Sequence, residues 1–148
     1  MDAAFAAHLA LYSALFFTAL CAGAMVLFAA AVAPLIHRVL DKAHARTLTR
    51  AIFPAYYLVL AVMAGLAAIS GFLVNVAAGI VLAVIAGGFL FARQVMMPRI
   101  NALNDEVARG STIQAGPAKM LHAWSVRMNM LQLFVLLVVF WFLALSAG

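Results

Sequence analysis

The residues best suited to chemistry gather near the start of the last apolar segment. His122, Ser125, Asn129 and Gln132 follow one another at spacings of three, four and three residues. On a helix with about 100° per residue, these four side chains fall within roughly 80° of one another. A stripe of imidazole, hydroxyl and amide groups would be costly against lipid, so we expect it to point toward neighbouring helices.

Further polar and ionisable residues are predicted to lie near the level of this stripe. Arg93 ends a long uncharged run, and Asn101 and Asp105 follow in the next connector. Ionisable groups at membrane depth are rare, and by default they mark a functional site. A purely structural interpretation also stays open, in which Arg93 extends toward the headgroups and Asp105 pairs with an arginine. The predicted ligand-binding set is His122, Ser125, Asn129, Gln132, Arg93, Asn101 and Asp105.

Composition places the chain in a membrane. Hydrophobic residues make up 69% of its 148 residues and charged residues 9%, with a mean hydropathy of +1.17. A soluble domain is nearer half apolar and about a quarter charged. The net charge of +5 gathers in two loops, which indicates orientation and contact with anionic lipid rather than with nucleic acid. Cys21 is the only cysteine and lies in an apolar segment, so we expect a buried free thiol.

The apolar segments predict one all-α domain over residues 1–148, a four-helix transmembrane bundle with up-down topology. The uncharged run from 51 to 92 is too long for one span and suits two, with a break at Asn75 and Gly79. Asp2 is the only early charge, so the first segment is expected to be retained rather than cleaved as a signal peptide. The expected spans are 5–36, 51–74, 78–97 and 122–147, with connectors at 37–50 and 98–121.

Local signals refine this expectation. Residues 37–50 are predicted to form a short amphipathic connector at the membrane interface. Pro34 is expected near the end of the first helix and Pro54 in the first turn of the second, while Pro98 is expected to end the third. Small residues four apart predict close helix packing at Ala61/Gly65, Ala67/Gly71 and Ala83/Gly87.

Charge distribution predicts the orientation. Both long connectors lie on one side of the membrane, and together with the adjoining helix ends they hold all nine Lys and Arg residues. The positive-inside rule then places the connectors in the cytoplasm and both termini on the outer side. On this interpretation Arg46 and Arg109 are topology signals, and neutralising either alone should have little effect.

Three kinds of chemistry remain open at the polar stripe. His37 and His122 on facing helices are candidate ligands for a b-type haem or another metal. Ser125 and His122 could form the nucleophile and base of a hydrolase, although no third orienting group is visible. A polar cavity that binds or passes a small solute needs only the amides, hydroxyl, imidazole and guanidinium already named. The absence of a complete catalytic set favours a protein that is not an enzyme.

A set of motifs in conserved order along the chain is similar to the transmembrane protein 205-like family, a four-span domain of unknown function in bacteria. The residues are Gly23, Pro34, Phe53-Pro54-x-Tyr56-Tyr57, Met97-Pro98-x-Ile100-Asn101-x-Leu103-x-Asp105 and His122-x-x-Ser125-x-x-x-Asn129. The resemblance implies a four-helix membrane domain, and the animal member of the family is linked to drug efflux or trafficking. A fainter similarity, through the Pro-x-x-Asn segment, is to the anthrone-oxygenase-like membrane family.

Together these features predict a small bacterial inner-membrane protein that binds or transports a small solute or ion at a polar site open to the cytoplasm. An accessory or assembly subunit of a larger membrane complex is the first alternative, and a homo-oligomer fits it equally well. A haem or oxidoreductase protein using His37 and His122 is the second. We expect Asn129→Leu or His122→Ala to abolish function while the protein still inserts.

Overall fold

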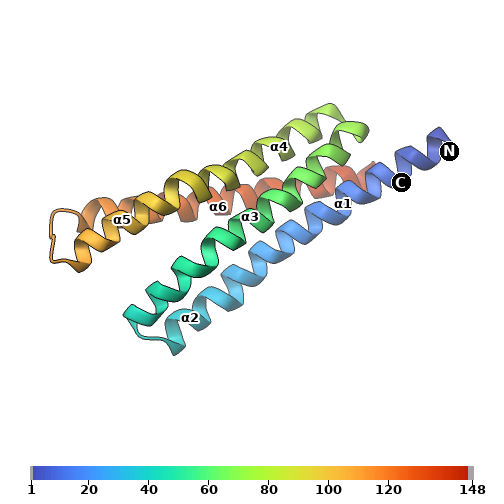
Figure 1. Ribbon diagram of the computed structural model, residues 1–148. Helices are drawn as coiled ribbons and strands as arrows, with labels where there is room; N and C mark the ends of the chain where they lie inside the picture. The colour runs from blue at the N-terminus through green and yellow to red at the C-terminus, as the bar shows by residue number, and fades with distance from the viewer. Residues whose placement is uncertain (1, 147–148) are drawn as a thin grey trace.

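The computed structural model describes residues 2–146, which form four long helices and no strand (Figure 1). Each helix is long and apolar enough to cross a bilayer, so the protein is a multi-pass membrane protein and the all-α prediction is confirmed. Neighbouring helices run antiparallel, and the two ends of the chain lie at the same end of the bundle (Figure 1). The four helices span Ala3–Val39, Lys42–Val74, Val76–Ala108 and Ala115–Leu145.

The first and third helices share an unusual construction. In the first, α1 (Ala3–Leu27) passes through a π-helical turn, η1 (Phe28–Val32), into α2 (Ala33–Val39). In the third, α4 (Val76–Phe91) passes through η2 (Ala92–Met96) into α5 (Met97–Ala108).

A proline follows each π-helical turn. Pro34 and Pro98 lack the N–H that would bond four residues back. The residue before each proline donates instead five residues back, Ala33 to Phe28 and Met97 to Ala92. The wider turn accommodates the proline within a continuous helix. The prediction that Pro98 ends its helix is therefore wrong, whereas Pro34 lies near the end of the first helix, at Val39, as predicted.

The second helix begins earlier than expected. α3 runs over Lys42–Val74, and the Asp41 carboxylate caps it by accepting from the backbone N–H of Ala43 at 2.9 Å and of His44 at 3.1 Å. The predicted amphipathic connector over residues 37–50 is wrong, because these residues end α2 and begin α3. Pro54 accordingly lies inside α3 rather than in its first turn.

The turn between α3 and α4 is the single residue Asn75, which confirms the predicted break. Asn75 Oδ1 accepts from the backbone N–H of Ala78 at 3.1 Å and so caps α4. The two helices approach closely beyond the turn. A Cβ added to Gly79 would lie 2.5 Å from Cγ of Phe72, and a Cβ added to Gly71 would lie 3.4 Å from Cα of Gly79. The closest approach therefore requires glycine at position 79.

Only part of the predicted small-residue packing is present. Ala67 and Gly71 are buried against α4, as expected. A Cβ at Gly65 or Gly87 would meet no atom within 4 Å, and Ala83 is exposed beside Gly87. These glycines therefore do not mediate close contacts within the described part of the chain.

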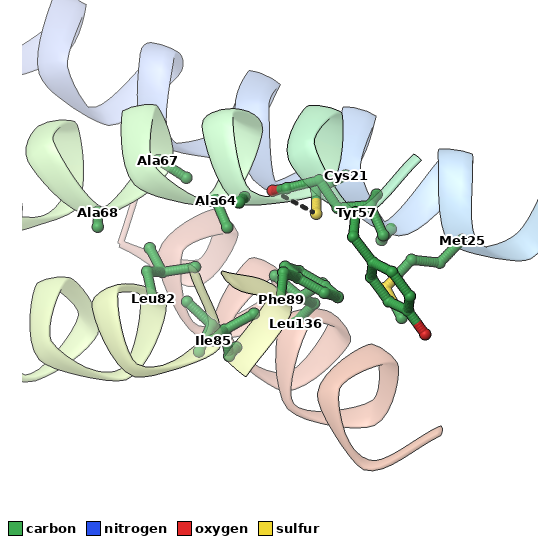
Figure 2. Close-up of a cluster of buried hydrophobic side chains, with 14 of the residues drawn as sticks. Cys21, Met25, Tyr57, Ala64, Ala67, Ala68, Leu82, Ile85, Phe89 and Leu136 are labelled. Atoms are coloured by element: carbon green, nitrogen blue, oxygen red, sulfur yellow. Dashed lines mark hydrogen bonds between the residues drawn. The ribbon is translucent and has the colours of Figure 1, made fainter. Parts of the chain in front are cut away.

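α6 (Ala115–Leu145) completes the bundle. It begins seven residues before the expected span, after a loop in which Gly110 has a φ of 101°. The expected end at residue 147 lies outside the described residues. The core packs the small residues of α3 against large side chains of α4 and α6, such as Leu82, Phe89 and Leu136 (Figure 2). Cys21 is a buried free thiol that contacts the Leu60 carbonyl at 3.8 Å, which confirms that prediction.

Candidate functional site

A cavity of about 530 Å³ lies between the connector ends of the helices. This volume falls in the range of about 300–1,000 Å³ that small-molecule sites occupy. All four long helices contribute to its wall. The lining residues that carry polar groups are His37, Lys42, Arg46, Thr49, Tyr56, Asn101, Asn104, His122 and Asn129.

The cavity is polar near the connectors and apolar toward the middle of the bundle. Apart from Ala45, the lining residues along α3 are Lys42, Arg46, Thr49, Phe53 and Tyr56, at helical spacings of four, three, four and three. They extend about 21 Å along the helix at 1.5 Å per residue. The deeper wall is completed by the apolar side chains of Met25, Phe28, Met97, Val126 and Met130.

Aromatic rings form the inner wall of this cavity. The ring of Phe28, in the π-helical turn η1, stacks on Tyr56 with centroids 4.5 Å apart and tilts against Phe53 at 5.3 Å. Stacked and tilted pairs at these distances are favourable beyond their buried area. The contacts fix η1 against α3 and give the site a firm apolar surface.

Four residues singled out by the sequence line this one cavity. His37 comes from α2, Asn101 from α5, and His122 and Asn129 from α6. The cavity thus brings together side chains from three separate helices. That they bind a ligand stays a prediction.

The other two members of the α6 stripe are buried beside the cavity rather than in its wall. Ser125 Oγ donates to the backbone carbonyl of His122 at 2.8 Å, so this hydrogen bond gives the hydrolase hypothesis no support. Gln132 Nε2 donates to the Ile85 carbonyl of α4 at 3.1 Å. A Cβ at Gly88 would lie 2.5 Å from that nitrogen, so the glycine makes room for the amide.

Asn129 connects the cavity to the core. Its Nδ2 donates to the hydroxyl of Tyr57 at 2.7 Å, while its Oδ1 is buried without a partner among the described residues. Tyr57 is only 1% exposed, and its ring packs near those of Phe53 and Phe89. An amide at this position therefore satisfies a buried hydroxyl and keeps one polar atom for a further partner.

Arg93 and Asp105 lie outside the cavity wall. Arg93 Nε donates to the Pro54 carbonyl at 3.0 Å. Asp105 accepts from Arg50 at 2.6 Å, and the same guanidinium nitrogen donates to the Asn101 carbonyl at 3.0 Å. These contacts join α3 to the third helix. Asp105 pairs with an arginine, as the structural interpretation expected, whereas the extension of Arg93 toward the headgroups stays a prediction.

Arg46, Lys42 and the α3 aromatics are the lining residues that sequence reasoning missed. Arg46 Nη1 donates to the Asn104 carbonyl at 3.3 Å and lies in the cavity wall, so its interpretation as a topology signal alone is revised. The spacing of residues 42, 46, 49, 53 and 56 along one helix face carried the signal. It was hidden because Pro54 suggested that the helix began near residue 51.

At the connector end, the backbones of the first and last helices stand apart. α1 packs against α6, whereas no Cα of η1 or α2 comes within 8 Å of a Cα of α6. Figure 1 shows the pair α2 and α3 diverging from the pair α5 and α6 at the connector end. On the opposite side, the Arg46 and Arg50 contacts close α3 against α5. Close backbone contact around the cavity is therefore lacking on the side between η1–α2 and α6.

The histidines share the cavity without forming a larger metal-binding group. Across residues 2–146 no three His, Cys, Asp or Glu side chains lie close enough together to hold a metal ion. His37 and His122 nevertheless line the same cavity, and two imidazoles are the minimum that a bis-histidine haem needs. The haem hypothesis stays a prediction.

The model of the domain of unknown function DUF4149 matches residues 16–109, which is more than half of the chain. The protein belongs to this family. The match runs from α1 to the end of α5 and includes both π-helical turns. α6, with His122 and Asn129, lies beyond it. No curated protein and no solved structure matches the chain.

Proposed function

We propose that the protein binds a small solute in the cavity at its connector end and passes it toward or across the membrane. The observation that carries this proposal is the cavity itself, since four helices direct imidazole, amide and cationic groups into one space of about 530 Å³.

The proposed setting is a bacterial inner membrane with both connectors in the cytoplasm. All nine cationic side chains lie on the connectors or in the half of each helix nearer to them, which supports this orientation by the positive-inside rule. The proposed similarity to the transmembrane protein 205-like family also supports a transport or trafficking role. The anthrone-oxygenase-like similarity supplies no reacting group at these positions.

The experiment compares small molecules retained by the purified protein when its cavity is open or filled. Ala29 lines the cavity and Ala30 does not, so Ala29→Trp fills the site and Ala30→Trp is the matched control. Mass spectrometry of the denatured proteins should detect a molecule in the wild type and in Ala30→Trp, but not in Ala29→Trp. Equal retention by both variants would contradict a solute site in this cavity.

The haem alternative rests on His37 and His122 lining the same cavity. A Soret band in the purified protein that disappears in His122→Ala would favour it over solute binding. The accessory-subunit alternative would gain from a partner that co-purifies at a fixed ratio and is released by Ala29→Trp.

A further inference from the structure

We infer that the ligand of this cavity is an anionic amphiphile, with its acidic head at the connector end and its apolar body directed toward the middle of the bundle. The inference rests on the proposed function and names its ligand class. It follows from three separate properties of the cavity: the sign of its charge, the direction of its polarity and the position of its opening.

The charge of the cavity wall favours an anion. Lys42 and Arg46 line it together with two histidines, and no acidic residue is among the lining residues of the described chain. The carboxylates near the connectors are already engaged by other groups. Asp41 pairs with His44, Asp105 with Arg50 and Glu106 with Arg109.

Lys42 and Arg46 consequently keep their charge available. Arg46 donates to a backbone carbonyl rather than to a carboxylate, and Lys42 has no hydrogen bond or ion pair within residues 2–146. The pKa of the exposed Asp41 carboxyl lies below its usual value, first because the His44 backbone N–H donates to it and then because the His44 imidazole does. That carboxylate therefore stays bound to its own helix start, and a phosphate or carboxylate head would supply the missing counter-ion.

The polarity of the wall changes in one direction. Lys42 and Arg46 lie at the connector end of α3, whereas Phe53 and Tyr56 lie two to four turns deeper. The same order holds on the first helix, from His37 to Met25. On α6 the apolar Val126 and Met130 lie deeper than His122, and the one deep amide, Asn129, is already bonded to Tyr57. A small inorganic anion would leave the inner part of this space without a partner. An apolar body attached to the head would fill it.

The opening suits a ligand that arrives from the bilayer. We place it between η1–α2 and α6, where no Cα of one comes within 8 Å of a Cα of the other. Val126 of α6, which lines the cavity, is an apolar side chain with 45% exposure. An amphiphile in the adjacent leaflet would keep its head at the level of Lys42 and Arg46 while its apolar part entered sideways.

The test measures saturable binding of radiolabelled dodecyl phosphate to the full chain in phosphatidylcholine nanodiscs, with empty nanodiscs subtracted. We expect one site per chain. Arg46→Gln should weaken binding about tenfold or more, because it removes a charge-assisted hydrogen bond. Arg46→Lys should keep most of the affinity, and Arg109→Gln, whose side chain pairs with Glu106 outside the cavity, should bind as the wild type does.

Lys42→Gln should also weaken binding, and it breaks no side-chain hydrogen bond or ion pair within residues 2–146. It therefore tests the inference even if an Arg46 variant fails to fold. Competition then identifies what is recognised. Displacement of dodecyl phosphate by dodecyltrimethylammonium at the same concentration would overturn the anionic head, and equal displacement by inorganic phosphate would overturn the apolar body. Displacement by phosphatidylglycerol would identify a membrane lipid as the source, and its failure would identify a free single-chain amphiphile.

The inference and the proposed function can fail separately. If Ala29→Trp removes a retained molecule but dodecyl phosphate does not bind, this inference is wrong and the solute site remains. Unchanged binding in both Arg46→Gln and Lys42→Gln would also overturn the inference. If Ala29→Trp changes neither retention nor binding, the cavity itself is not the site.

Discussion

The bond between Asn129 and Tyr57 should couple α6 to α3 by about 1 kcal/mol. Asn129 Nδ2 lies 2.7 Å from the Tyr57 hydroxyl, which is buried with a side chain only 1% exposed. Interhelical hydrogen bonds in membrane proteins average about 0.6 kcal/mol and reach about 1.7 kcal/mol. A short bond to a fully buried hydroxyl belongs in the upper half of that range.

A double-mutant cycle measures this coupling directly. Tyr57→Phe keeps the ring and removes the hydroxyl, and Asn129→Leu keeps the volume and removes the amide. The free energy of unfolding of the wild type, both single variants and the double variant would be measured by reversible unfolding in mixed dodecylmaltoside and SDS micelles. Each single variant should lose stability, and the double variant should lose less than their sum.

The control cycle pairs Tyr57→Phe with Ser125→Ala. Ser125 donates to a carbonyl of its own helix and shares no partner with Tyr57, so this cycle should show additivity within about 0.3–0.5 kcal/mol. A coupling between Tyr57 and Asn129 no larger than that of the control would refute the reasoning. The Asn129 amide would then contribute nothing to the packing of α6 against α3.

Three further predictions follow from the fold and the site. Gly79→Ala should lower the free energy of unfolding by up to about 2 kcal/mol, because an overpacking cost of about 1–3 kcal/mol exceeds the helix-propensity gain of about 1 kcal/mol. Gly87→Ala, with open space around it, should be neutral or stabilising in the same assay. Equal effects of the two substitutions would contradict the close packing at Gly79. His122→Ala and Asn129→Leu should abolish retention of the bound molecule while both proteins accumulate normally in membranes, and loss of retention only alongside loss of folded protein would reduce the stripe to packing. A membrane-impermeant thiol reagent should label Thr112→Cys in inverted vesicles and not in intact cells, and labelling in intact cells would reverse the proposed orientation.

Much of the fold could be predicted because composition and apolar run length depend little on tertiary detail. Four helices, the Asn75 turn and the inward stripe of α6 all follow from the chain. The helix starts and ends could not be placed in the same way. Pro54 and Pro98 are local breaking signals, but π-helical turns and tertiary contacts keep the helices continuous through such positions.

The candidate site was predictable to a similar extent. His37, His122 and Asn129 were expected at one level, with Asn101 in the connector just beneath, and the structure brings all four to one cavity. The cationic face of α3 was missed because recognising it requires the helix to begin at Lys42. The separation of α2 from α6 depends on tertiary packing, and no residue pattern in either helix predicts it.

An experimentally determined structure in lipid nanodiscs, with no ligand added, tests the central claim most directly. The account predicts non-protein density in the cavity, with a head near Arg46 and His122 and a body against Phe28 and Tyr56. It also predicts that α2 and α6 remain apart in the bilayer. A structure in which α2 closes onto α6, so that protein side chains fill the space between Arg46 and Asn129, would contradict the account.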